Sequence, residues 1–264
     1  MSTLLPVGIT AEPVSHHPPV AVRPVLLHQH WADVVFLHWP VPAEMVAPLL
    51  PAGVHPDVHG GTSWVGLVHF RMVRLGFGPL PGIPWLGDFA ETNVRLYSVD
   101  DEGRRGVVFG SLDADRGLPV LAARGAAALP YNWAPSRVQV ERTGDVVDTV
   151  QYDTVRRWPG PRGTRTSTRV RVGAEIAEPS DLEHFLTARW ALHTSRLGPR
   201  GRTTVRWPNE HPQWRLHTAE LEHLEEEAIA AAGLPGVTST PPSSVLFSPG
   251  LPVRFGPWRR VRTR

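Results

Sequence analysis

The 264-residue sequence contains no cysteine and no lysine. The lack of cysteine excludes disulfides, thiolate nucleophiles, zinc–thiolate centres and iron–sulfur clusters, and it fits a cytoplasmic protein. The lack of lysine means that all 27 basic residues are arginines. A Schiff-base amine and a phosphate-binding P-loop lysine are therefore excluded as well.

Long apolar runs and a large net charge are also lacking. No run approaches the roughly 20 apolar residues that span a bilayer, and residues 1–20 lack the basic and apolar regions of a secretory signal. The net charge is only +2, although the pI is about 9.6 because arginine stays protonated to very high pH. We therefore expect a cytoplasmic protein with no nucleic-acid partner and no membrane partner.

Proline and glycine are abundant, with 28 and 24 residues, which favours turns and short strands over long helices. The length suffices for one large domain or two small ones. Residues 1–22 are rich in Pro, Ser and His and lack periodicity, so they predict a flexible arm. Residues 23–264 are then expected to form a single domain.

Alternating or apolar segments bounded by turn residues predict many short strands. They lie at 25–41, 63–74 (after a Gly-Gly turn in a hairpin over 55–75), 89–97, 107–115, 136–142, 146–156 and 165–174, with further hairpins at 193–207 and 243–255. Helices are expected at 42–50, 116–129, 179–190 with a capping box, and in the acidic part of 211–236. Because regular βαβ alternation is absent, the fold class is α+β, with a mostly antiparallel sheet or barrel and a few packed helices.

The segment "FAETNVRLY" at residues 89–97 has an unusually polar strand face. Glu91, Asn93, Arg95 and Tyr97 share that face because side chains alternate along a strand. They would either form a solvated surface or line a site. Residues four apart on a strand lie about 13 Å apart, so Glu91 and Arg95 are expected to have separate partners. The planar guanidinium of arginine suits a substrate carboxylate.

Several segments in order resemble the YqjF-like (DUF2071) domain family, over about residues 25–258. They include "HWPVPAEMVAPLLPAGVHPDVHGGTSWVGLVHFRM", "FAETNVRLY", "LPYNWAPSRV", "HPQWRLHTAELE" and "SVLFSPGLPV". More distantly, the chain is similar to the acetoacetate decarboxylase-like superfamily. That resemblance implies an antiparallel β-barrel or cone with outer helices and a polar interior pocket, and it puts Glu91 at the position of a pocket glutamate.

The sequence departs from the decarboxylases at the Gly-Phe-Pro-Lys-Lys turn that carries their Schiff-base lysine. Tyr131 and Asn132 stand there instead, in "LPYNWAP". Without an amine there is no imine electron sink, so the fold may be shared while the reaction is not. An enclosed polar lumen favours the interior for the polar face of residues 89–97.

The candidate catalytic residues are Glu91, Tyr131 and His211. Glu91 would donate or accept a proton, with burial raising its pKa toward neutrality. Tyr131 would donate a hydrogen bond to an enolate or oxyanion, and His211 would act as a general acid or base. The candidate substrate-binding residues are Arg71, Asn93, Arg95, Arg124, Asn132 and Trp133.

Arg95 and Arg71 are expected to anchor anionic groups and Asn93 to stabilise enolate-like charge. Some of the candidate residues also have plain structural interpretations. Arg71 would alternatively lie at an exposed strand end, and Arg124 would be a solvated helix side chain. His211 lies in a loop, where histidines are often structural.

No cofactor or metal is expected. His28 and His30 form an H-x-H pair that would supply half of a metal site, with His38 nearby, but spacing identifies no third ligand. Whether these histidines bind a metal or haem is left open. Motifs for nucleotide cofactors and for triad hydrolases are absent from the sequence.

These features predict a small-molecule enzyme that transfers a proton on a carboxylate- or carbonyl-bearing metabolite. Its reaction would be of the isomerase, lyase or cyclase type, without a Schiff-base lysine. The alternative is a non-catalytic ligand-binding or sensing protein with the same pocket, which the ten tryptophans would suit. A structural protein with a flat surface is a third interpretation, and assembly into a homo-oligomer is left open.

Overall fold

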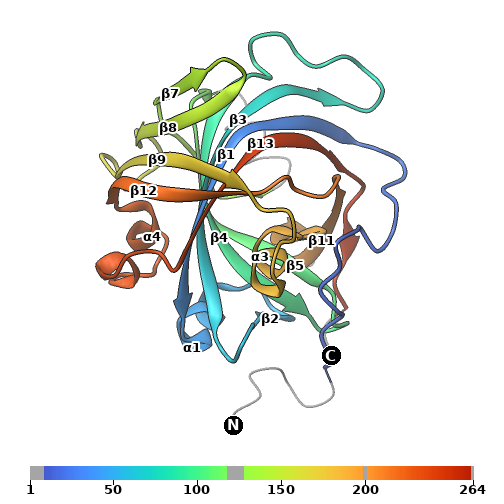
Figure 1. Cartoon of the computed structure of the whole chain (residues 1–264). Helices are drawn as coiled ribbons and strands as arrows, with labels where there is room; N and C mark the ends of the chain where they lie inside the picture. Colours follow the sequence, from blue (N-terminus) through green and yellow to red (C-terminus); the bar gives the residue numbers. More distant parts are fainter. Residues whose placement is uncertain (1–8, 118–127, 199–200, 263–264) are drawn as a thin grey trace.

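The computed structural model describes residues 9–117, 128–198 and 201–262. Strands dominate this part of the chain, and its helices are few and short. β1, β3 and β13 curve side by side through the molecule (Figure 1). The predicted mostly antiparallel, strand-rich fold is confirmed, with less helix than expected.

The strands and helices have the following bounds. The strands are β1 (Leu27–Val41), β2 (Val54–Pro56), β3 (Ser63–Phe77), β4 (Phe89–Asp100), β5 (Arg105–Ala114), β6 (Tyr131–Trp133), β7 (Ser136–Thr143), β8 (Val146–Val155), β9 (Arg165–Glu175), β10 (Ala191–Gly198), β11 (Gly201–Glu210), β12 (His217–Glu226), β13 (Ser244–Phe255) and β14 (Arg259–Arg260). The helices are α1 (Ala43–Val46), α3 (Asp181–Thr187) and α4 (Ala228–Ala231), with 3-10 turns η1 (Ala47–Leu49) and η2 (Val237–Ser239).

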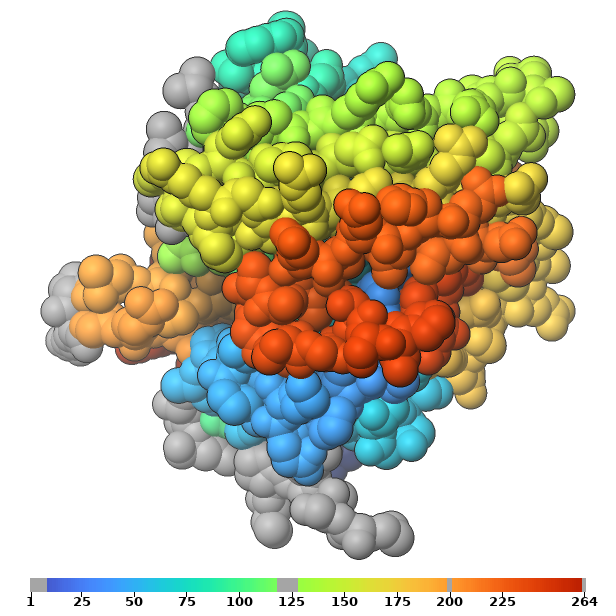
Figure 2. Space-filling model, turned by 90° about the vertical axis from the view of Figure 1, so that its left-hand side faces the viewer, coloured from blue at the N-terminus to red at the C-terminus, as the bar shows by residue number. Residues whose placement is uncertain are grey.

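The strands are hydrogen-bonded in the order β14-β11-β10-β5-β4-β3-β1-β13-β12-β9-β8-β7. β11 also pairs with β13 through Asn209 and Glu210, so the two ends of the path from β11 to β13 are hydrogen-bonded to each other as well. β12, β9, β8 and β7 follow β13 in the strand order. Figure 2 shows β12 and α4 lying between β9 and the segment around α1.

Two cores lie on the two faces of the central strands, because side chains alternate along each strand. β4 is buried along its whole length. Tyr97 belongs to the interior core, with Trp31 and Phe70. Val94 packs on the outer side with Ile229 and with the apolar residues of β8 and β9. Each fully buried Val or Leu contributes about 1.5–3 kcal/mol by leaving water.

The acidic part of 211–236 forms a strand, which corrects the predicted helix. Glu222 on β12 forms ion pairs with Arg169 and Arg171 on the neighbouring β9. Strand pairing thus overrides the helix propensity of the Ala, Glu and Leu residues. Only the four residues of α4 are helical there.

Two predicted hairpins also differ. Residues 244–255 form one continuous strand, because β1 pairs with both halves of β13 around the Ser-Pro-Gly sequence. Gly250 has a φ of 112°, and a Cβ there would lie 1.8 Å from the Trp31 carbonyl oxygen. The Gly60-Gly61 turn does precede β3, but β2 pairs with β4 and not with β3.

Other predicted elements are confirmed. Ser180 and Glu183 form the capping box of α3, α1 and η1 occupy the predicted helix at 42–50, and β7 to β11 match the predicted strands closely. The helix predicted at 116–129 falls mostly on residues 118–127, which lie outside the described residues. Within the described part of the chain, the structure has no helix of the length and apolarity needed to cross a membrane.

The described part of the predicted flexible arm is anchored. The backbone N–H of Glu12 donates to Gly103, and its carboxylate accepts from the backbone of Arg105. Nε1 of Trp190 donates to the carbonyl of Ser15, and Val22 is buried. Backbone and side-chain hydrogen bonds therefore hold the described part of this segment against the rest of the chain. The single domain over 23–264 stays a prediction.

Candidate functional site

Glu91 is a buried carboxyl group, only 3% exposed, in the middle of the fold. Its Oε2 accepts a 2.9 Å hydrogen bond from the Tyr131 hydroxyl, and its Oε1 lies 3.5 Å from Nδ2 of Asn93. Burial raises the pKa of Glu91 to about 7, although the two hydrogen bonds and nearby Arg95 act in the opposite direction. The carboxyl therefore changes protonation near neutral pH, as a general acid or base requires.

Tyr131 reaches Glu91 because of the register of β6. This short strand runs parallel to β5, with Tyr131 opposite Leu112 and Asn132 opposite Asp113. Adjacent side chains on a strand point to opposite faces. Tyr131 therefore faces the interior, whereas Asn132 faces the outer side, away from the Glu91 carboxyl.

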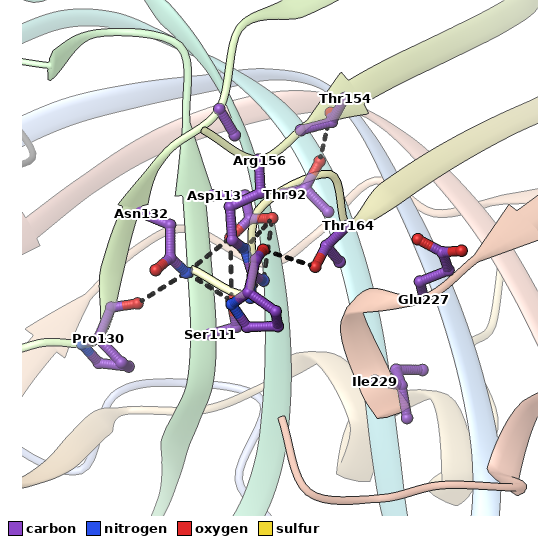
Figure 3. Close-up of polar contacts among 12 residues, drawn as sticks. Thr92, Ser111, Asp113, Pro130, Asn132, Thr154, Arg156, Thr164, Glu227 and Ile229 are labelled. Carbon is purple, nitrogen blue, oxygen red and sulfur yellow. Dashed lines mark hydrogen bonds and ion pairs between the residues drawn. The ribbon is translucent and has the colours of Figure 1, made fainter. Parts of the chain in front are cut away.

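Asn132 instead joins a buried polar network on that outer side (Figure 3). Its Nδ2 donates to Oδ1 of Asp113 at 2.8 Å and to Oγ of Ser111 at 3.0 Å. Arg156 donates to the same carboxylate through Nε and Nη2, both at 3.0 Å. These four residues are buried. The network therefore fixes β6 against β5 and holds Tyr131 opposite Glu91.

Arg95 is a second buried charge on the inner face of β4, also 3% exposed. It lines a cavity of about 30 Å³ together with Trp31, Phe109 and His211. Among the described residues, no carboxylate forms an ion pair with Arg95, and its Nε has no hydrogen-bond partner. A buried charge without a counter-ion is costly, so this cavity suits an anionic group.

The other arginine of this cavity, Arg189, is already paired. Its guanidinium lies 2.5 Å from Asp57 and 4.8 Å from the centre of the Tyr97 ring. The Tyr97 hydroxyl lies 2.8 Å from Nε2 of His38 and donates to the carbonyl of Leu186. Arg189 was not predicted as a site residue because no periodic pattern marks a residue just after a helix end. Its only signal is a charge flanked by aromatic residues in "FLTARW".

His211 lines the Arg95 cavity as well. Burial lowers its pKa to about 4, and the charge on Arg95 adds to the effect. Its Nδ1 lies 2.6 Å from the Pro212 carbonyl, which can only accept, so Nδ1 carries the proton and Nε2 is an acceptor. The neutral ring therefore suits accepting a proton or a hydrogen bond, not donating a proton at pH 7.

Three other predicted binding residues do not join this group. Arg71 forms an ion pair with Asp33 on the outer side of β3, because alternation puts it on the face opposite Phe70. This position fits the alternative of an exposed strand end, and a substrate-binding role for Arg71 stays a prediction. Trp133 is 41% exposed and lines a separate open cleft with Arg157. Arg124 lies outside the described residues.

The histidines that suggested half of a metal site make different contacts. Nε2 of His28 bonds with the carbonyl of Leu80, and His38 contacts Tyr97 in the interior. Across the described ranges, no three His, Asp or Glu side chains gather as metal ligands would. The structure thus shows no partner ligands for the H-x-H pair in this part of the chain.

Solved structures of similar fold include acetoacetate decarboxylase-like enzymes. The enduracididine biosynthesis enzyme MppR, complexed with pyruvate, is 15% identical with a TM-score of 0.61, covering 96% of this chain and 99% of its own. An acetoacetate decarboxylase-like enzyme from Sphingomonas wittichii RW1 is 12% identical with a TM-score of 0.61, covering 90% and 93%. The acetoacetate decarboxylase of Legionella pneumophila is 14% identical with a TM-score of 0.60, covering 92% and 90%. At these identities the likeness is one of fold.

Sequence similarity identifies the family. The uncharacterized protein YqjF of Bacillus subtilis (strain 168) is 32% identical over 209 residues, which cover 79% of this chain and 82% of YqjF. Residues 28–252 match the DUF2071 family, described as "Uncharacterized conserved protein". The chain therefore belongs to the DUF2071 family.

Proposed function

We propose that this protein is a small-molecule enzyme that moves a proton on the carbon next to a carbonyl group of a carboxylate-bearing metabolite. The observation that carries the proposal is the pairing of two groups on the inner face of β4. One is Glu91, whose pKa is raised by burial to about 7. The other is Arg95, a buried cation without a carboxylate partner among the described residues. Pyruvate bound to MppR, on a similar fold, supports a small oxo acid as ligand.

In this proposal the two ends of the polar face of β4 have separate tasks. Arg95 binds the substrate carboxylate, which supplies the counter-ion that the cavity lacks. Asn93 stands between Arg95 and Glu91 on the same face, so a bound carbonyl group can meet its amide. The returning path of strands forms a closed barrel in this proposal, and its wall excludes bulk water from the carboxyl group.

The chemical step needs no lysine. The Glu91 carboxylate removes a proton from the carbon next to the carbonyl, the C–H electron pair forms a C=C bond, and the carbonyl π pair moves onto oxygen. The Asn93 amide supplies a donor for that oxyanion, and the Tyr131 hydroxyl supplies a second donor once the proton transfer has neutralised Glu91 and freed the hydroxyl to turn. Return of the proton from Glu91 to another atom of the enolate gives isomerisation, and loss of a leaving group or ring closure gives a lyase or cyclase.

Proton exchange tests this proposal without knowledge of the full reaction. Small 2-oxo and 3-oxo carboxylates, including pyruvate, are incubated with the protein in D₂O, and NMR follows loss of the protons next to the carbonyl. We expect catalysed exchange for at least one compound, loss of exchange in Glu91→Gln, and no effect of Glu222→Gln on exposed β12. Unchanged exchange in Glu91→Gln would sink the proposal.

A binding or sensing protein is the second candidate. The observation that favours it is the closure of the site, since the Arg95 cavity is only about 30 Å³ and Glu91 is already held by Tyr131 and Asn93. This candidate predicts carboxylate binding that depends on Arg95, with no exchange above that of the Glu91→Gln variant.

A further inference from the structure

The Arg95 cavity and a much larger cleft share one lining residue among the described residues. The cleft has a volume of about 600 Å³ and is lined by parts of β5, β10 and β11 and the turn after η1. The cavity has a volume of about 30 Å³. Among the described residues that line these two spaces, Phe109 alone belongs to both. Phe109 therefore lies between the cavity and the cleft.

A β-bulge puts Phe109 at this position. The register between β4 and β5 shifts by one residue, so Val94 is opposite Ser111 whereas Arg95 is opposite Phe109. Gly110 is the extra residue, and a Cβ there would approach Cβ of Ala232 to 3.2 Å. Bulges redirect side chains next to sites. Here the bulge makes Phe109 the direct cross-strand neighbour of Arg95.

The two strands beside Phe109 are sparsely paired with each other. Within the described residues, β5 and β10 share a single register pair, Leu192 with Val107. Past that pair, the Thr194 hydroxyl on β10 donates to the carbonyl of Ala128, not to β5. Moving the Phe109 ring would therefore open a passage without breaking strand hydrogen bonds.

We propose that Phe109 sets the chain length of the carboxylate that this site accepts. A cavity needs about 10–15 Å³ to hold one water, so the present space holds little more than a carboxylate group. A longer ligand anchored on Arg95 meets the Phe109 ring. Removal of the ring joins cavity and cleft, and an alkyl chain then extends outward. This inference rests on the proposed role of Arg95 as the carboxylate anchor.

Calorimetric titration of the full-length protein with acetate, butanoate, hexanoate and octanoate tests the inference. For the unmodified protein we expect at least a tenfold fall in affinity between acetate and hexanoate. Phe109→Ala is expected to bind hexanoate and octanoate at least tenfold more tightly than the unmodified protein does. Phe109→Leu is a milder change that serves if Phe109→Ala does not fold. It is expected to bind hexanoate, but not octanoate, more tightly than the unmodified protein does.

Two control variants distinguish the effect of removing the Phe109 ring from the effect of a larger volume alone. Val107→Ala enlarges the cavity without reaching the cleft, and Leu129→Ala enlarges the cleft without reaching the cavity. Neither variant is expected to bind octanoate more tightly than the unmodified protein does. An unchanged length profile in both Phe109 variants, or an equal gain in Val107→Ala, overturns the inference and leaves the proposed function standing. Absence of Arg95-dependent binding of acetate and butanoate overturns both.

Discussion

The hydroxyl of Tyr131 on β6 donates to Oε2 of Glu91 on β4 across the intervening strand β5, at 2.9 Å. Ala114 of β5 pairs with Glu91, and its side chain is small. The phenol thereby favours the ionised carboxylate, while burial favours the protonated form. The balance of these two effects keeps the pKa of Glu91 near neutrality.

Tyr131→Phe should raise the pKa of Glu91 above that of the unmodified protein, because the lost hydrogen bond stabilised the carboxylate. The shift is measured by ¹³C NMR titration of the Glu91 carboxyl carbon. Asn132→Ala should raise the pKa in the same direction, because Asn132 holds β6 against β5. A pKa that stays the same or falls in Tyr131→Phe would contradict the assigned contact.

Glu91→Gln should stabilise the protein at alkaline pH. The folded-state pKa of Glu91 is about 7, above its ordinary value of 4.5. Between pH 4.5 and pH 7 the folded state therefore binds more protons than the unfolded state does. The stabilisation from that proton is complete below about pH 4.5 and is lost as the pH rises through 7. We expect the variant to gain up to roughly 3 kcal/mol over the unmodified protein above pH 8, and little below pH 4.5.

Chemical unfolding at several pH values provides the measurement. Glu226, whose pKa burial also raises to about 7, titrates in both proteins and cancels in the difference. Exposed Glu222→Gln is the matched control and should show no such pH dependence. A difference between Glu91→Gln and the unmodified protein that is constant with pH would mean that Glu91 keeps an ordinary pKa.

Arg156→Leu should destabilise the protein strongly. It leaves the buried Asp113 carboxylate without its cation, and breaking a buried pair costs about 3–5 kcal/mol. The control is Arg215→Leu, which removes the exposed ion pair with Glu175 and should leave stability unchanged. Comparable unfolding midpoints in urea for these two variants would show that the Asp113 network does not hold β6 in place.

Gly250→Ala should destabilise the β1–β13 pairing. Gly250 has a positive φ, and its new Cβ would overlap the Trp31 carbonyl oxygen at 1.8 Å. Gly61→Ala is a matched control, because Gly61 also has a positive φ but nothing lies within 4 Å of an added Cβ. Thermal unfolding should show a clearly larger loss for Gly250→Ala; equal losses would point to backbone strain alone.

The strands that could be predicted from sequence are those with a local signal. Period-2 alternation located β4 and its inner face, and the capping box located α3. The predictions for β12 and β13 were wrong. The helix-forming residues of β12 are overridden by its pairing with β9, and the Ser-Pro-Gly turn signal of β13 by its pairing with β1. Such pairing depends on residues distant in sequence, so a local pattern cannot contain it.

The same limit applies to the candidate site. Alternation put Glu91, Asn93 and Arg95 on one face, but it did not reveal that Arg71 lies on the outer face. Tyr131 and Asn132 were predicted together, and only the parallel register of β6 on β5 separates them. Arg189 and Phe109 were missed because a helix end and a β-bulge position them, and neither feature leaves a periodic signal.

The central claim is that Glu91 is poised to exchange a proton near neutral pH. Titration of ¹³C-carboxyl-labelled glutamate in the unmodified protein tests it most directly, with Glu91→Gln identifying the Glu91 signal beside that of Glu226. The account predicts a Glu91 midpoint near pH 7. A midpoint near 4.5 would contradict it, because the carboxyl would then be a permanent anion at physiological pH.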